Sequence, residues 1–383
     1  MATCCTLFRR ARIAAALATA GAMPAQAPAA AAGEPPAHPR VLWHVPGKWG
    51  CYQELPLHKG VLWAAGDTLT AHDVQTGKEL HRATLEGSWY YPVLSGGLVF
   101  ARHQDGSLHV FTLDLSRELW SMPLAQSWHT GCAHGDMYFT ASGNEVVAIT
   151  GGKEHWKVDL GARVDMRPAT DGVNVYAGTA DGRVVGIGLQ TGEIAWEYEN
   201  GAEFGTTSPV VDGGTLFMSD RGVKNVRKAH LNAFDAQSGR LLWSTEFGAT
   251  GFSLPYPHGD RVWAGFGVTV ASFDRKTGVL DWENRIVTGR NPFGQPGMTG
   301  SAIVFGNLDG NLYVHDAATR ALRWRFEVGT DKQAQVAGWA MHDGVLIVTS
   351  TRGVLGIGET PGAPPVEPGF VLRLEEQAQE TGR

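Results

Sequence analysis

The chain has 383 residues and a formal net charge of −6, with acidic and basic residues interspersed along its length. This balance argues against nucleic acid as the main partner, because nucleic-acid-binding proteins concentrate Lys and Arg on one surface. Beyond the N-terminal segment there is no apolar run of about 18 residues, so we expect a soluble mature chain without a membrane-spanning helix. The 50 glycines indicate many tight turns.

Residues 1–27 have the features of a secretion signal peptide. Arg9, Arg10 and Arg12 form a positive segment, Ile13–Met23 is apolar and rich in small residues, and Ala25–Ala27 fits a signal-peptidase site. The general secretion route and the twin-arginine route both remain open. We therefore predict a secreted or periplasmic protein, and residues 28–39 follow the predicted cleavage site as an Ala/Pro-rich linker.

The rest of the chain is built from a repeat that closes on tryptophan. In its clearest copy, Ala233–Trp243 (AFDAQSGRLLW), an apolar segment leads into Asp, a Ser-Gly turn follows, and Trp closes the unit. Successive closing positions are separated by 36 to 47 residues, and a period near 40 predicts a repeat architecture. The closing positions are Trp43, His81, Trp120, Trp156, Trp196, Trp243, Trp282 and Trp324.

Each repeat contains four short runs that are typical of β-strands. In Val164–Trp196 these runs are separated by Asp-Gly, Asp-Gly and Thr-Gly pairs, which favour hairpin turns. Four strands in about 40 residues form one propeller blade, and the closing Trp on the outermost strand is expected to pack between neighbouring blades. Residues 40–358 are therefore predicted to form an all-β, eight-bladed β-propeller of four-stranded antiparallel blades.

The last set of strands, Gln335–Gly358, has no closing Trp of its own. Arg40–Val45 supplies one, so the N-terminal strand should complete the last blade and remove the open edge of the ring. Three copies depart from the repeat: His81 replaces Trp, Leu115–Arg117 shortens a turn, and Arg320 replaces Gly. These departures leave the packing of the affected blades open.

On these motifs the chain resembles the PQQ-type (quinoprotein alcohol dehydrogenase-like) β-propeller repeat family, which includes the BamB-like envelope propellers. The resemblance covers residues 40–358, but the cysteine of a lipoprotein signal is missing, so no membrane anchor is expected. It implies either a binding or scaffold protein or a dehydrogenase that holds pyrroloquinoline quinone (PQQ) on calcium. Against the dehydrogenase, the chain is short, the mature part lacks adjacent cysteines, and no calcium ligand set can be assembled.

The segments that precede the inner strands should gather at one mouth of the central channel, and we call this side the mouth face. Glu54, His129 and Asp165 are the candidate acid–base residues there, with Arg167 placed to orient an anion or a carbonyl group. Aromatic residues could either plug the channel or form a small-molecule pocket. The predicted ligand-binding residues are Trp89, Tyr90, Tyr91, Trp128, Phe252, Phe293, Gln295 and Trp339.

The fifth repeat carries a longer loop, Asp220–His230, which accounts for the longest spacing between closing positions. By topology this loop also lies on the mouth face. It is either a solvated surface loop, or a lid or landing site for an anionic group. Its predicted contact residues are Arg221, Lys224, Arg227 and Lys228.

No metal site is predicted. Cys132 and His134 share one side of a strand, but two ligands do not make a site. A disulfide between Cys51 and Cys132 is permitted in an exported protein, although their repeats are not neighbours and unbonded thiols are favoured. The tail, residues 359–383, is expected to be disordered, with an added edge strand at Phe370–Leu374 as the alternative.

The favoured function is that of an exported, monomeric binding or scaffold protein that takes an envelope protein or a small-molecule ligand at the mouth face. The alternative is an enzyme that acts on a small organic substrate, either without a cofactor or as a PQQ-dependent oxidoreductase. No catalytic signature such as GxSxG or HExxH supports the alternative.

Overall fold

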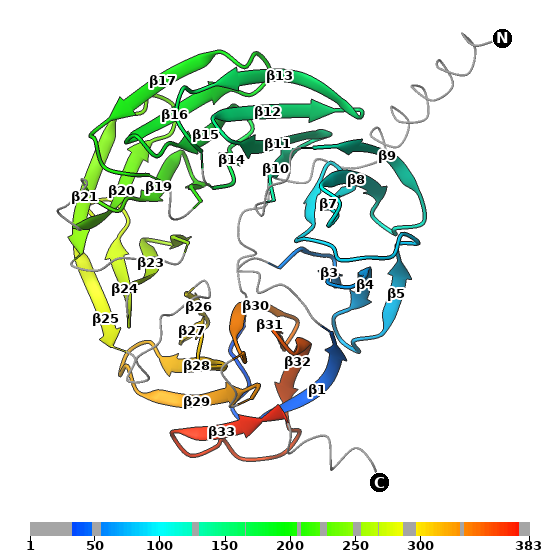
Figure 1. The fold of residues 1–383 in the computed structure, drawn as a ribbon. Coiled ribbons are helices and arrows are strands. Elements are labelled where there is room, and N and C mark those ends of the chain that lie inside the picture. The colour runs from blue at the N-terminus through cyan, green and yellow to red at the C-terminus, as the bar shows by residue number, and fades with distance from the viewer. Residues whose placement is uncertain are drawn as a thin grey trace.

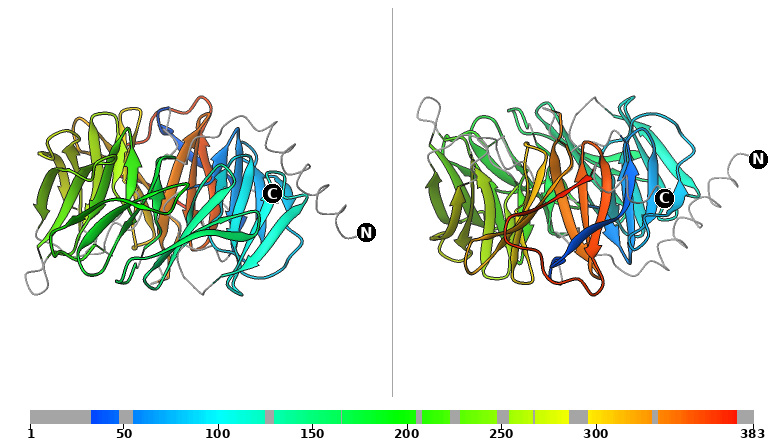
Figure 2. Two further views of the ribbon diagram at one scale, coloured as in Figure 1. Left: turned by 90° about the horizontal axis from the view of Figure 1, so that it is seen from above. Right: turned by 90° about the horizontal axis from the view of Figure 1, so that it is seen from below.

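The computed structural model describes residues 33–47, 55–124, 130–164, 166–204, 208–222, 228–247, 254–266, 268–285, 296–329 and 333–374. Eight antiparallel sheets surround a central axis as blades (Figure 1), which confirms the predicted eight-bladed β-propeller. Seen from the side, the ring is wider than it is thick (Figure 2). Within the described ranges, no helix has the length and hydropathy needed to cross a membrane.

The first four blades follow one another along the chain, each running from the inner strand to the outer strand. Their strands are β2 (Leu57–His58), β3 (Val61–Ala65), β4 (Leu69–Asp73) and β5 (Glu79–Arg82); β6 (Val93–Ser95), β7 (Leu98–Arg102), β8 (Ser107–Thr112) and β9 (Glu118–Pro123); β10 (Cys132–His134), β11 (Met137–Ser142), β12 (Glu145–Thr150) and β13 (Lys153–Asp159); and β14 (Ala169–Thr170), β15 (Asn174–Gly178), β16 (Arg183–Gly188) and β17 (Ile194–Glu199).

The last four blades continue the ring, and the eighth combines strands from both ends of the chain. Their strands are β18 (Val210–Asp212), β19 (Thr215–Ser219), β20 (Ala229–Asp235) and β21 (Leu241–Phe247); β22 (Tyr256–His258), β23 (Arg261–Phe266), β24 (Thr269–Asp274) and β25 (Leu280–Arg285); β26 (Gly297–Thr299), β27 (Ala302–Gly306), β28 (Asn311–Asp316), β29 (Leu322–Glu327) and β33 (Phe370–Arg373); and β30 (Val336–His342), β31 (Val345–Ser350), β32 (Gly353–Glu359) and β1 (Pro39–Pro46).

The Asp and Gly of the repeat shape the turn between the third and fourth strands of a blade. In blade 5, Asp235 accepts hydrogen bonds from the backbone N–H and the hydroxyl of Ser238. These bonds hold the pKa of Asp235 below its usual value. Gly239 follows with a φ of 71°, which disfavours a side chain. The same position is also crowded, because a Cβ on Gly239 would lie 2.3 Å from the indole ring of Trp196.

The closing tryptophans pack between blades as predicted. The Trp196 indole N–H donates to the Ala236 carbonyl of the next blade at 3.0 Å, and Trp43, Trp156 and Trp243 make the equivalent bond to their own next blades. Each of these four side chains is at most 9 % exposed. A buried indole with its N–H satisfied contributes both apolar burial and a hydrogen bond, so these residues have a structural role.

In blade 1, which lacks a closing Trp, another residue makes the contact with the next blade. His81 is exposed on β5 and does not fill the groove toward blade 2. Instead, Trp63 on the second strand of blade 1 is buried, and its indole N–H donates to the Leu113 carbonyl in the outer turn of blade 2 at 2.8 Å. Blades 1 and 2 are therefore also joined by an indole-to-carbonyl hydrogen bond, but its donor lies on β3 instead of the outermost strand.

The other two departures are also accommodated. Leu115 adopts a φ of 53° in the shortened turn of blade 2, and Arg320 adopts 66° where the other copies have Gly. The Arg320 guanidinium lies 5.8 Å from the ring centroid of Trp282, where a cation–π contact is favourable. Both departures are therefore local, and the sheet count is eight.

The N-terminal strand closes the ring as predicted, because β1 pairs antiparallel with β32 over Pro39–Pro46. The linker before it takes part as well. The Trp324 indole N–H donates to the Pro36 carbonyl at 2.8 Å, and Glu34 forms an ion pair with Arg323 at 3.2 Å. The start of the described chain thereby supplies the partner that a following blade supplies elsewhere.

The prediction of disorder in the tail is wrong for residues 359–374. Phe370–Arg373 forms β33, which pairs in parallel with β29 and makes blade 7 five-stranded (Figure 1). Leu372 is buried in the core between blades 7 and 8, and Arg373 forms an ion pair with Glu327 at 3.3 Å. Burial of this apolar residue and the added ladder explain why the segment is ordered.

Candidate functional site

The mouth face carries two kinds of loop. Because the strands of a blade alternate in direction, the segment entering each inner strand and the turn between the second and third strands lie at the same end of the blade. The described inner strands begin directly after the predicted mouth segments, with one exception. Trp339 lies inside β30, so the assignment that placed it before an inner strand is corrected.

Several predicted site residues lie outside the described residues. These are Glu54, His129, Asp165, Trp128, Phe252, Phe293, Gln295, Lys224 and Arg227, together with Cys51 of the disulfide considered above. Of the four predicted catalytic residues, the structure thus describes Arg167, the orienting residue, which is half-buried at the entrance to blade 4. The acid–base arrangement and the disulfide stay predictions.

The described aromatic residues of the predicted pocket contribute mainly to blade cores. Trp89, Tyr91 and Trp339 are 2 %, 5 % and 8 % exposed, whereas Tyr90 is half-buried. Tyr91 packs in the cluster between blades 2 and 3, and Trp339 packs in the cluster of blades 7 and 8. Side chains at this level of burial resemble packed core residues, and their ligand-binding role stays a prediction.

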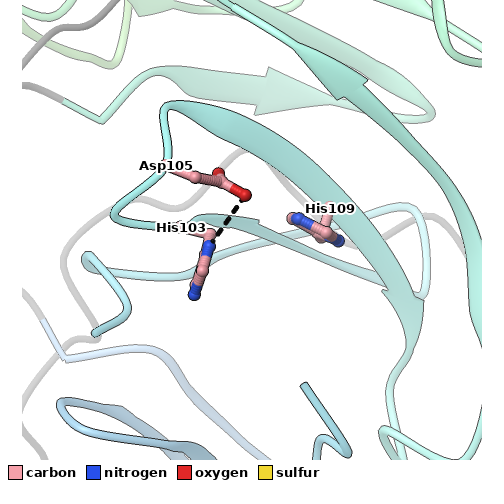
Figure 3. Close-up of side chains that lie close together, drawn as sticks. All are labelled: His103, Asp105 and His109. Atoms are coloured by element: carbon pink, nitrogen blue, oxygen red, sulfur yellow. Dashed lines mark ion pairs between the residues drawn. The ribbon is translucent and has the colours of Figure 1, made fainter. Parts of the chain in front are cut away.

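Trp89 leads to a polar cluster that the sequence analysis did not identify. Its ring lies 4.9 Å from the His103 ring and 5.2 Å from the His109 ring, measured between centroids. His103 follows β7, His109 lies on β8, and Asp105 occupies the turn between the two strands (Figure 3). One potential ligand atom from each of His103, Asp105 and His109 lies within 4.8 Å of the others.

Hydrogen bonds fix both imidazole rings of this cluster. His103 Nε2 is 3.2 Å from the Glu86 carbonyl, and His109 Nδ1 is 3.1 Å from Glu118 Oε1. Glu86, Glu118 and Asp105 each present an oxygen that can only accept, so both nitrogens of His103 and Nδ1 of His109 face acceptors. The remaining nitrogen, His109 Nε2, faces the Ser107 hydroxyl.

Asp105 supplies the negative charge of the cluster. Its Oδ2 is 3.1 Å from His103 Nδ1, and its Oδ1 accepts a hydrogen bond from the Ser107 hydroxyl at 2.5 Å. The Ser107 hydroxyl, acting against the smaller effect of burial, lowers the pKa of Asp105 to about 2. The carboxylate is therefore ionised at neutral pH and half open to solvent.

A sequence signal for this cluster exists in HQDGSLH, residues 103–109. An Asp-Gly turn between two β-runs places residues on opposite strands side by side. The His103 N–H donates to the Ser107 carbonyl, and His109 pairs with Ala101, so the two histidines share one face of the hairpin.

The long loop of blade 5 is held at its neck by a buried carboxylate. Asp220 is fully buried and accepts hydrogen bonds from the Gly222 N–H, the His230 N–H and ring Nδ1, and the Asn232 amide. The described Arg and Lys side chains of the loop remain exposed beside this neck. These are Arg221, which is 3.8 Å from Glu203, and Lys228, which is 2.9 Å from Glu246.

The described residues do not fit a calcium-bound quinone. Calcium takes six to eight oxygen ligands, mostly from carboxylates and carbonyls. In the part of the chain that the structure describes, the one group of at least three His, Cys, Asp or Glu side chains with ligand atoms within 4.8 Å of one another is the His103–Asp105–His109 cluster. Two of its three donors are imidazoles. Cys132 and His134 gain no third ligand among these residues.

Comparisons with known proteins agree with the architecture. The BamB of Burkholderia pseudomallei is 27 % identical over 290 residues, which cover 73 % of this chain and 66 % of that protein. A quinohemoprotein alcohol dehydrogenase, ADH IIB of Pseudomonas putida, is 29 % identical over 163 residues, but the match covers 38 % of this chain and 23 % of the enzyme. The chain thus matches less than two thirds of the length of either relative.

The solved structure of BamB from Moraxella catarrhalis superposes with a TM-score of 0.64 at 18 % identity and covers 85 % of this chain and 99 % of that one. At this identity the likeness concerns the fold alone. The family model described as outer membrane protein assembly factor BamB matches residues 104–226 and 204–357. Because these two matches together span more than half of the sequence, the chain belongs to the BamB family of PQQ-type β-propellers.

Proposed function

We propose that this chain is an exported envelope propeller that binds a protein partner through its mouth face, as a scaffold rather than as an enzyme. Family membership supports the scaffold role, and the relatives named BamB are described as outer membrane protein assembly factors. The proposed location is the periplasm. The predicted signal peptide, residues 1–27, lies outside the described residues and supplies the sequence argument for export.

One observation favours a protein partner over a small substrate. Three of the four described aromatics predicted for the pocket are buried in blade cores, whereas the charged side chains of Arg221 and Lys228 are 53 % and 55 % exposed. Buried Asp220 fixes the neck of their loop, so a partner meets these cations in a preorganised position. An acidic partner surface would compete with Glu203 and Glu246 for these two cations, so association should depend on salt.

The test is capture of an envelope partner by the mature protein and by charge-reversal variants. The double variant Arg221→Glu/Lys228→Glu should lose the partner that the wild-type protein captures. The matched control is Lys78→Glu/Lys276→Glu, because both lysines are exposed in outer turns at the opposite end of the blades.

The control should retain the partner, with an unchanged circular dichroism spectrum for both variants. Equal capture by the two double variants, or no reproducible partner of the wild-type protein, would contradict the proposal. A chromophore that purifies with the wild-type protein and is released on denaturation would instead favour the enzyme hypothesis.

A further inference from the structure

We propose that His103, Asp105 and His109 bind a divalent transition-metal ion, of which Zn²⁺ is the reference case, on the mouth face between blades 1 and 2. The inference does not depend on the proposed partner. The three side chains converge from one hairpin of blade 2 (Figure 3). The side chains of His103 and His109 are more than nine-tenths buried, whereas that of Asp105 is 57 % exposed.

Acceptors and negative charge surround the two imidazole rings. His103 Nδ1 lies 3.1 Å from Asp105 Oδ2, and His109 lies between Glu118 Oε1 and the Ser107 hydroxyl, which itself contacts Asp105. Positive charge is favoured beside these two carboxylates, and a metal ion that displaces ring protons supplies it.

The donor set selects the class of ion. Two imidazole nitrogens and one carboxylate oxygen suit Zn²⁺, Co²⁺, Ni²⁺ or Cu²⁺, whereas Ca²⁺ and Mg²⁺ prefer oxygen ligands alone. Tetrahedral bonds of about 2.1 Å place ligand atoms about 3.4 Å apart. The atoms here lie within 4.8 Å of one another, so the ligand atoms farthest apart move closer by about 1.4 Å when the ion binds. The fourth position then opens to solvent beside Asp105.

Neighbouring groups orient the two imidazoles for this role. A metal-binding His usually donates its second N–H to a carbonyl or a carboxylate, and here the Glu86 carbonyl and the Glu118 carboxylate accept those protons. Gly87 permits the first contact, because a Cβ there would lie 2.4 Å from His103 Nε2. On metal binding, His109 Nε2 exchanges its contact with the Ser107 hydroxyl for the ion.

Titration of the metal-free mature protein with Zn²⁺ in a calorimeter, and with Co²⁺ followed by its visible absorption, tests the site. We expect one ion per chain. Asp105→Asn and His109→Gln should each remove this binding event. Glu118→Gln keeps an acceptor for His109 Nδ1 but removes its negative charge, and it should weaken binding by about 10- to 100-fold. The control is His155→Gln, because His155 is exposed on outer strand β13.

In Asp105→Asn the side-chain oxygen can still accept the hydrogen bond from the Ser107 N–H, so the turn is expected to keep its shape. This variant therefore decides the test if His109→Gln does not fold. Stoichiometric binding that is lost in Asp105→Asn and retained in His155→Gln supports the site. No stoichiometric binding by the wild-type protein, or undiminished binding by Asp105→Asn, overturns it. In the thermal unfolding of the wild-type protein, Zn²⁺ but not Ca²⁺ should raise the midpoint, because an ion that binds only the folded chain stabilises it.

Discussion

Replacing Trp63 with Phe measures the contribution of the hydrogen bond that links blades 1 and 2. The substitution removes the donor to the Leu113 carbonyl and leaves that partly buried acceptor unpaired. Trp263 occupies the equivalent position in β23 of blade 6 and is fully buried, but its indole N–H has no hydrogen-bond partner among the described residues. Trp263→Phe therefore removes similar volume without removing a bond.

An unpaired buried partner costs about 1–3 kcal/mol, and the lower part of that range applies here because Leu113 is half-buried. Trp63→Phe should thus lower the free energy of unfolding by about 1–2 kcal/mol more than Trp263→Phe does. Urea unfolding followed by far-ultraviolet circular dichroism gives both values, provided that the slopes agree. Equal losses at the two positions, or a larger loss at Trp263, would refute the assignment of Trp63 as the replacement for a closing Trp.

Two further predictions concern the turns of the repeat. Gly239→Ala should lower the free energy of unfolding by at least about 1 kcal/mol more than Gly201→Ala. Both glycines have a φ of 71°, but only at Gly239 would an added Cβ clash with the Trp196 ring. Equal urea midpoints for the two variants would contradict this prediction. Asp316 has its pKa lowered by the Thr319 N–H and the Arg323 guanidinium, so its stabilisation is complete above the unfolded pKa near 3.8 and is lost as pH falls through the lower native value. Between pH 5 and about 2.5, Asp316→Asn should lose less stability than the wild-type protein, and parallel pH profiles would exclude this role of Asp316.

The fold was predictable because the residues that shape each blade lie close together in the sequence. The Asp that caps a turn, the Gly with positive φ and the closing Trp lie within about ten residues of one another, so the pattern is visible in a single copy such as Ala233–Trp243. Repetition then determines the blade count, and the unpartnered Arg40–Val45 strand indicates how the ring closes.

The rest depends on contacts between segments that no local pattern links. Trp63 replaces the missing Trp at the position of His81 from a different strand, and β33 pairs with β29 although Arg373 and Glu327 are 46 residues apart. The predicted site came from the segments that precede the inner strands. The His103–Asp105–His109 cluster instead comes from the turn between the second and third strands of a blade.

The closure of blade 8 by β1 also sets an order of assembly. Ala37 and Glu359 are joined by a hydrogen bond across 322 positions, so the first strand to leave the ribosome has to wait for nearly the last one. Non-local pairing of this kind slows folding and prolongs the lifetime of open edges. Until β32 is available, β1 of one nascent copy can insert into the eighth blade of another. Domain swapping of β1 between two copies is therefore the misassembly that we expect for this topology.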